Sequence, residues 1–223
     1  MGGGCLQDGS VPLKLFVSTL RRIKKELGLT VFVHTGIVDH ELANKLKIAG
    51  IDAALIDIIG SEQTIHEVYN LRTSVESYDL SLKFLKQSGM NFIPHLVVGL
   101  HYGELRGESH AIDVISSHTP SALVILSFIP IHGTKMANVN PPKPIDIARA
   151  IAVARLKLPR TPLILGCMRP KGDHRSKTDI LAVKAGVDGI AFPSEEVIDY
   201  TKRSGFRFSF SSACCANIYR DIL

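Results

Sequence analysis

The sequence predicts an α/β protein built around a parallel sheet, and three observations support this prediction. From residue 29 onward, short apolar runs alternate with longer amphipathic stretches, as in repeated strand–helix units. The apolar runs are nearly continuous, as expected of strands that are covered on both faces. The chain has 223 residues, 45% of them hydrophobic, and no linker divides it. A single domain over residues 1–223 with one substantial core is therefore expected.

Six strands are expected, each followed by a helical stretch. They cover residues 29–34, 53–58, 92–100, 122–128, 162–167 and 187–192. Gly50, Gly89 and Gly186 each stand between a helical stretch and the next strand, which predicts helix C-caps. Residues 206–211 alternate Phe with polar residues and predict an edge strand or a closing hairpin.

The chain begins with a glycine run, Gly2, Gly3 and Gly4, where a strand is expected to come first. Residues 10–28 then predict a helix capped at Ser10 and ended by Gly28. A complete eight-stranded barrel takes about 250 residues and starts with a strand. The expected fold is an incomplete TIM-type (β/α) barrel, with about six parallel strands, outer helices and no counterpart of the first two strands. Its unpaired edges predict a homo-oligomer or a partner chain that completes the barrel.

Composition excludes several classes of function. The formal net charge is +5 and the pI is about 9.0, but Lys and Arg are scattered, which argues against nucleic acid as a partner. No apolar run reaches the roughly 18 residues of a membrane span, and the start lacks the pattern of a secretory leader. A cytoplasmic protein acting on a small or carrier-bound molecule is expected.

Polar residues gather after the predicted strands, at the edge where ligands bind in parallel α/β sheets. His34, Asp57 and His95 come at or near three such ends, and Glu104 follows in a glycine-rich loop. Asp57 ends the apolar run "AALIDII", where a charge needs a partner or a ligand hydroxyl. A packed histidine explains His34 equally well, and Glu104 has a second interpretation as the start of the next helix.

The loop "GCMRPKGDHR", residues 166–175, holds a cysteine, several cations and a histidine. Arg169 follows a strand and precedes Pro170, so its guanidinium is expected at the open mouth, where it complements an anionic ligand. For Lys171, His174 and Arg175 a solvated basic loop is the alternative to a role in ligand binding.

The four cysteines are Cys5, Cys167, Cys214 and Cys215. Reduced thiols are expected, because no secretory leader accompanies them. Cys214 and Cys215 are adjacent and suit a shared metal ion poorly. A cluster that joins them to Cys167 is the alternative to ordinary buried side chains.

Six strings together resemble the biotin synthase-like branch of the radical S-adenosylmethionine enzymes. They are "GGG" before a helix, "HTGIVD", "DAALIDIIGS", "VVGLHYGE", "LSFIPIHGTKM" and "LGCMRPKG". The nearest likeness is to the radical component of the two-protein archaeal-type lipoyl synthase. The resemblance runs from the second βα loop of that barrel to its end, over nearly all of this chain.

The resemblance implies a set of cofactor and substrate contacts. It assigns S-adenosylmethionine to Gly2, Gly3, Gly4, Asp57, Ser61, Gly99, Leu100, Ile129 and Ile131, with the triglycine at the methionyl amine and the two isoleucine backbones at the adenine. It puts Arg169 beside the substrate, and His34, His95 and Glu104 are the further substrate candidates.

The chain departs from the family at the C-x-x-x-C-x-x-C motif that holds the [4Fe–4S] cluster, because no spacing of its four cysteines reproduces it. The expected function is a radical barrel component of a sulfur-inserting or related transferase, inactive alone unless a cluster-binding segment is supplied. The alternative is a noncatalytic or degenerate barrel that binds a nucleoside or an anionic small molecule. A metal-independent barrel enzyme using His34, Asp57 and Arg169 rests on fold analogy alone.

Overall fold

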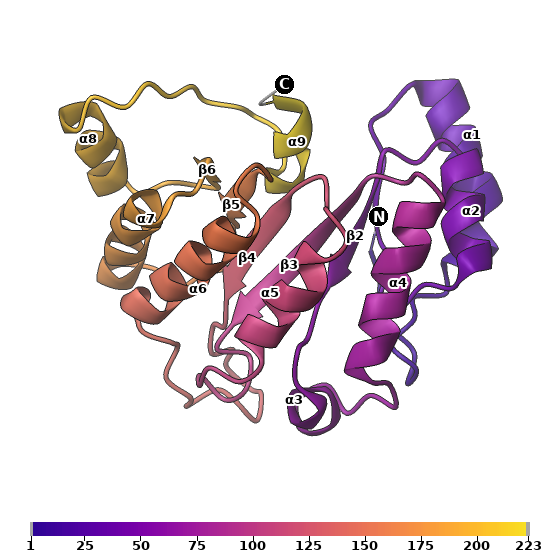
Figure 1. The fold of residues 1–223 in the computed structure, drawn as a ribbon, viewed down its shortest axis with the longest axis horizontal. Helices are drawn as coiled ribbons and strands as arrows, with labels where there is room; N and C mark the ends of the chain where they lie inside the picture. Colours follow the sequence, from indigo (N-terminus) through magenta and orange to yellow (C-terminus); the bar gives the residue numbers. More distant parts are fainter. Residues whose placement is uncertain (1, 222–223) are drawn as a thin grey trace.

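Six parallel strands form one sheet in a computed structural model that describes residues 2–221 (Figure 1). The strands are β1 (Phe32–His34), β2 (Ala53–Asp57), β3 (Phe92–Val98), β4 (Leu123–Ser127), β5 (Leu163–Leu165) and β6 (Gly189–Ile190). The strand order in the sheet is the order in the chain, and every neighbouring pair is parallel. The prediction of an α/β fold with six parallel strands, part of a barrel, is confirmed.

Most helices cover one face of the sheet, and the two short C-terminal helices pack on the other face (Figure 1). The helices are η1 (Leu13–Phe16), α1 (Val17–Leu27), α2 (His40–Ile48), α3 (Glu62–Glu67), α4 (Val75–Gln87), α5 (Glu108–Ser116), α6 (Pro144–Lys157), α7 (Asp173–Ala185), α8 (Glu195–Arg203), η2 (Cys215–Asn217) and α9 (Ile218–Asp221). Side-chain caps begin several of them: the Asp39 carboxylate accepts from the Leu42 amide at 2.7 Å, and Ser61 and Ser194 cap α3 and α8.

Two hydrophobic layers result from the alternation of side chains along each strand. One layer lies between the sheet and the helices and includes Ala54, Ile56 and Val98. The other lies on the concave face and includes Leu55, Val97 and the neighbouring strand residues Ala53, Ile93, Val124, Leu126, Phe128 and Ile164. We call this concave face the lumen. Because Asp57 and His95 share the strand parity of Leu55 and Val97, their side chains also face the lumen.

The C-terminal segment closes the lumen at the amino-terminal ends of the strands, opposite α3 (Figure 1). Ala216, Ile218 and Tyr219 pack on the lumen layer, and the Tyr219 hydroxyl donates to the Asp52 carbonyl at 3.3 Å. Arg220 reaches Thr30 at 3.2 Å, just before β1. The carboxyl-terminal edge of the sheet is therefore the end at which a ligand has access.

Some local expectations need correction. Every strand is shorter than its apolar run, because residues at one or both ends of each run lie in the connecting loops. Residues 206–211 form no strand and are exposed, with no neighbouring strand to pair with. The first helix begins with the short η1 instead of at Ser10, whose hydroxyl donates to the Asp8 carboxylate at 2.7 Å. The C-caps are confirmed, since Gly28, Gly50, Gly89 and Gly186 all have φ between 61° and 95°.

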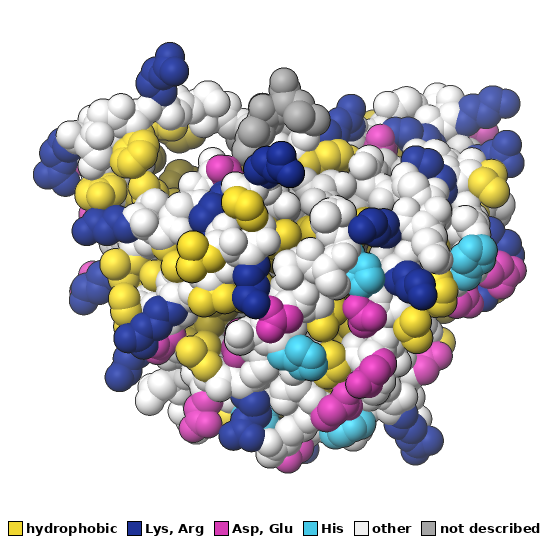
Figure 2. All heavy atoms as spheres, in the orientation of Figure 1, with side chains coloured by type: hydrophobic (Ala, Val, Ile, Leu, Met, Phe, Trp, Pro, Cys, Tyr) yellow, Lys and Arg dark blue, Asp and Glu magenta, His cyan; other side chains and the backbone are white. Residues whose placement is uncertain are grey.

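Surface charge on the viewed face is mixed. Figure 2 shows Lys and Arg side chains spread among acidic and hydrophobic ones without a continuous basic stripe. Among the described helices, none is both long and apolar enough to cross a membrane.

Candidate functional site

The site begins at β1, where the N-terminal segment lies against the carboxyl-terminal end of the strand. The Val11 amide donates to the Thr35 carbonyl at 3.1 Å, and Ser10 pairs with Gly36 in an isolated bridge. A side chain at Gly2 would lie 3.6 Å from the ring of His34. The glycine run is exposed, and Gly2 borders the His34 side chain; its contact with the methionyl end stays a prediction.

Three polar side chains meet at the lumen on neighbouring strands. Asp57 and His95 are register partners on β2 and β3. The rings of His34 and His95 lie 5.5 Å apart, across β2. No hydrogen bond to the Asp57 carboxylate is present among the described residues, and the buried Nδ1 atom of His95 has no partner there either. We call His34, Asp57 and His95 the lumen triad.

Burial sets the charge states of the triad. It raises the pKa of the Asp57 carboxyl, while nearby His34 acts in the opposite direction. Burial, with a smaller effect of His34, lowers the pKa of His95 to about 4. His95 is therefore neutral at physiological pH. The unpartnered Nδ1 atom of the buried imidazole and the poorly solvated carboxylate beside it leave hydrogen-bonding capacity open to a ligand.

A second polar group lies beyond β3. The Gly99 amide donates to the Oε1 atom of Glu108 at 2.8 Å, and the Oε2 atom of Glu108 is buried without a partner. Burial raises the pKa of this carboxyl. The Nδ1 atom of nearby His101 lies 3.2 Å from the Thr64 hydroxyl. Because Glu108 uses the Gly99 amide, that amide is not free for an adenine ring.

Other predicted contacts lie at the same edge with different surroundings. Ser61 caps α3, with its hydroxyl accepting from the Thr64 amide at 3.3 Å. Leu100 is half-buried, and Glu104 is exposed in the loop after β3. The Ile129 peptide groups have no hydrogen bond among the described residues, and Ile131 is exposed. The roles assigned to these residues stay predictions.

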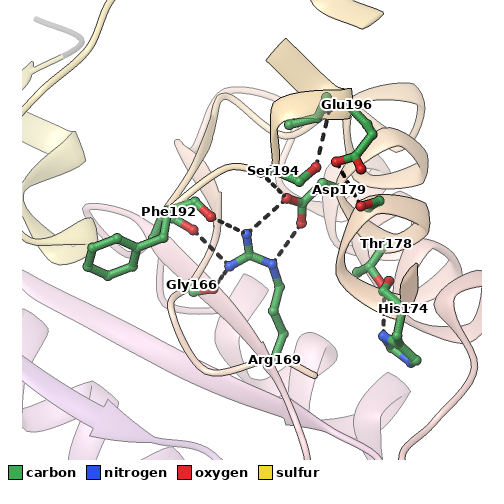
Figure 3. Close-up of polar contacts among 11 residues, drawn as sticks. Gly166, Arg169, His174, Thr178, Asp179, Phe192, Ser194 and Glu196 are labelled. Carbon is green, nitrogen blue, oxygen red and sulfur yellow. Dashed lines mark hydrogen bonds and ion pairs between the residues drawn. The ribbon is translucent and has the colours of Figure 1, made fainter. Parts of the chain in front are cut away.

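Arg169 is placed differently from its prediction (Figure 3). Its side chain is fully buried, and two of its nitrogens bind the carboxylate of Asp179, Nε at 2.7 Å and Nη2 at 3.1 Å. The remaining donors bind the carbonyls of Gly166, Ala191 and Phe192 at 2.7, 2.8 and 3.1 Å. The prediction that this guanidinium points into the open mouth is corrected: it fastens the loops after β5 and β6 to α7. A substrate contact for Arg169 remains a prediction that this arrangement does not favour.

Three of the cysteines lie near one another. The Sγ atoms of Cys214 and Cys215 are 4.0 Å apart, and Cys167 influences the Cys215 thiol. Burial, then the neighbouring thiols, raise the pKa of Cys215 to about 12. Within residues 2–221, no group of three His, Cys, Asp or Glu side chains has the geometry of a metal site. The metal assignment of Cys167, Cys214 and Cys215 therefore gains no support.

Sequence reasoning missed two residues. Asp179 sits inside α7, where nothing in the helical pattern indicates a buried carboxylate. Glu108 was not among the predicted contacts, yet it is 9% exposed and binds the Gly99 amide. Its position nine residues after Gly99, with a glycine directly before it, was the available signal.

Comparison with known proteins identifies relatives of this chain. The chain is 27% identical over 177 residues to biotin synthase 2 of Polaromonas sp., covering 79% of this chain and 51% of that protein. It is 29% identical over 189 residues to biotin synthase of Rickettsia felis, covering 83% of this chain and 59% of that protein. These relatives support a biotin synthase-like radical S-adenosylmethionine family for this chain. It spans about half the length of the curated relatives it matches.

A solved structure supports the fold. The crystal structure of methylornithine synthase superposes with a TM-score of 0.62 at 15% identity, over 95% of this chain and 67% of that one. No family model matches the chain. The sequence relatives therefore support the family, and the structural neighbour shows the fold.

Proposed function

We propose that this chain is the part of a biotin synthase-like radical barrel that binds S-adenosylmethionine and faces the substrate. One observation carries the proposal: the lumen triad joins three adjacent strands at the accessible edge, and the buried Nδ1 atom of His95 has no hydrogen-bond partner among the described residues. Membership of the family makes S-adenosylmethionine the cofactor to expect there.

The residues present suit S-adenosylmethionine in part. The Asp57 carboxylate is a hydrogen-bond acceptor with no protein donor among the described residues, which complements ribose hydroxyls. The Ile129 peptide groups are similarly unpaired and complement the edge of an adenine ring. Gly2 leaves space beside His34 for the methionyl end. Bound S-adenosylmethionine supplies an activated sulfonium, and the chain's own residues hold its polar groups at the edge of the sheet.

The residues present do not suit a [4Fe–4S] cluster. The four cysteines lack the C-x-x-x-C-x-x-C spacing, and no described side-chain group has metal-site geometry. We therefore derive no step through a cluster in this chain. Sulfur insertion, transferase activity and a cytoplasmic location belong to the proposal for the whole protein.

A second candidate function is a noncatalytic or degenerate barrel that binds a nucleoside. The same unpaired Asp57 and Ile129 groups favour it. The structure gives less support to a barrel that binds an anionic small molecule, because Asp179 and three carbonyls already accept the hydrogen bonds of Arg169.

Assembly is part of the proposal as well. β1 and β6 are the edge strands of the described sheet. We propose that a second copy or a partner chain pairs with at least one of these edges, since exposed strand edges favour such pairing.

Isothermal titration calorimetry with S-adenosylmethionine tests the proposal. Asp57→Asn is expected to weaken binding roughly 10- to 100-fold, the value of one hydrogen bond to a charged group. Asp199→Asn is the control, because that carboxylate is exposed on α8 and distant in sequence from the edge. Absence of binding by the wild-type chain, or equal affinity of the Asp57 variant, contradicts the proposal. Anaerobic reconstitution with iron and sulfide tests the argument about the cluster: a colourless protein that binds S-adenosylmethionine supports a chain that does not hold it, and a protein that gains the absorbance of a cluster contradicts it.

A further inference from the structure

Three cysteines from two distant parts of the chain lie near one another beside the lumen. Cys214 and Cys215 belong to the C-terminal segment, and Cys167 belongs to the loop after β5. The Sγ atoms of Cys214 and Cys215 are 4.0 Å apart, and the main-chain amide of Cys167 donates toward the Cys215 thiol. The proposed function uses none of these thiols.

Packing holds the C-terminal segment against the last two strands of the sheet. Cys215 packs on the lumen layer that includes Ile164 of β5. A Cβ atom at Gly189 of β6 would lie 2.8 Å from the Ile164 side chain and 3.3 Å from that of Ile218. The strands that precede and follow the Cys167 loop therefore both contact the C-terminal segment.

The loop that carries Cys167 is fixed as well. The Ser127 amide donates to the Met168 carbonyl at 2.9 Å, which attaches this loop to β4. The buried guanidinium of Arg169 binds Asp179 of α7 at 2.7 Å. The main chain at Cys167 is therefore held in place beside the C-terminal segment.

Exposure gives the three thiols different reactivity. Cys167 and Cys214 are exposed, whereas Cys215 is half-buried and its pKa is raised by burial, which keeps this thiol protonated. A bond between Cys214 and Cys215 is disfavoured, because adjacent Cα atoms lie about 3.8 Å apart and disulfides usually span about 4.4–6.8 Å. Cys167 is therefore the thiol that an oxidant reaches first and the partner with suitable chain separation.

We infer that Cys167 and Cys215 are a peroxide-sensitive thiol pair, which forms a disulfide between the loop after β5 and the C-terminal segment. Hydrogen peroxide first oxidises the Cys167 thiol to a sulfenic acid and is itself reduced to one water. The Cys215 sulfur then attacks the Cys167 sulfur, so that the S–S bond forms while the S–O bond breaks. The hydroxyl group leaves with the Cys215 proton as a second water.

The bond has a mechanical consequence. It ties the segment that closes the amino-terminal end of the lumen to the sheet, and it links residues that are far apart in the unfolded chain. Restricting the unfolded chain in this way is expected to raise Tm by roughly 5–15 °C. Dithiothreitol is expected to reverse the change, because thiol–disulfide exchange opens the bond.

Peptide mapping of the full chain tests the inference. The chain is treated with a small excess of hydrogen peroxide at pH 8, free thiols are blocked with N-ethylmaleimide, and tryptic peptides are analysed by mass spectrometry without reduction. The expected product is the Cys167 peptide linked to the peptide that holds Cys214 and Cys215. No linked product, a link to Cys5, or a link between two chains on a nonreducing gel overturns the inference.

Serine variants identify the partner of Cys167. Cys215→Ser is expected to abolish both the link and the rise in Tm, whereas Cys214→Ser and Cys5→Ser, the matched controls, are expected to keep both. A link that persists in Cys215→Ser with native far-ultraviolet dichroism overturns the assignment. If Cys215→Ser fails to fold, a peroxide-induced rise in Tm that persists in Cys167→Ser overturns it instead.

Discussion

Removing the carboxylate of Asp179 is expected to destabilise the protein strongly. Arg169 and Asp179 are both 0% exposed, and their side chains share two hydrogen bonds. The same carboxylate accepts from the Ser194 amide at 2.9 Å, which fixes the start of α8. In Asp179→Ala the guanidinium keeps its three carbonyl contacts but loses its counter-charge inside the protein.

The magnitude follows from that burial. Breaking one partner of a buried ion pair costs roughly 3–5 kcal/mol, because the remaining charge stays desolvated. For a chain of this length, each kcal/mol lowers Tm by roughly 2–4 °C, so the expected decrease is about 6–20 °C. Urea unfolding followed by far-ultraviolet dichroism gives the free energy of unfolding directly.

A matched control and a double variant make the result specific. Asp199→Ala removes an exposed carboxylate 4.0 Å from Lys202 and is expected to stay within about 0.5 kcal/mol of wild type. Arg169→Met combined with Asp179→Leu removes both charges and is expected to be more stable than Asp179→Ala alone. A loss below about 1 kcal/mol in Asp179→Ala refutes the argument that this pair fastens the loops after β5 and β6.

Three further predictions follow from other parts of the structure. Burial lowers the pKa of His95 to about 4, so the free energy of unfolding is expected to fall by roughly 3 kcal/mol as the pH decreases from about 6.5 to 4. Urea unfolding of His95→Leu at the same pH values is expected to lack this decrease. In the same assay, Gly99→Ala is expected to lower the free energy of unfolding by about 1–3 kcal/mol more than Gly205→Ala. Both glycines have positive φ, but only at Gly99 would a new Cβ meet a proline side chain, that of Pro142, at 2.6 Å. Equal losses in the two variants refute the packing argument. Iodoacetamide at pH 8 is expected to alkylate exposed Cys167 well before Cys215, whose thiol has its pKa raised to about 12, and mass spectrometry that finds equal rates contradicts this order.

The sequence predicted the sheet because its strands are buried on both faces and read as continuous apolar runs. It did not predict where each strand ends, since Leu29 and Phe192 extend the apolar runs yet lie in loops with exposed side chains. The alternation in residues 206–211 resembled a strand, but strand formation needs a neighbour, which the sequence does not specify.

The candidate site was predictable only at the level of position. Residues at the ends of parallel strands share one edge, which predicted Asp57 there; His95 lies inside β3 and meets Asp57 through the register of the two strands. Arg169 shows the limit of that reasoning, because its partner Asp179 lies ten residues away inside a helix and pairs with it only after α7 packs. A charged residue at a strand end predicts a polar or oppositely charged partner. Only the packed structure shows whether that partner is a ligand or another residue.

The central claim is that the lumen triad forms a ligand site at the carboxyl-terminal edge of the sheet. The most direct measurement is the set of backbone amide shifts in the ¹⁵N-labelled chain when S-adenosylmethionine is added. The account predicts saturable shifts concentrated at His34, Asp57 and Ile129. Shifts confined to the opposite end, around Asp52 and Tyr219, or no shifts at millimolar ligand, would contradict it.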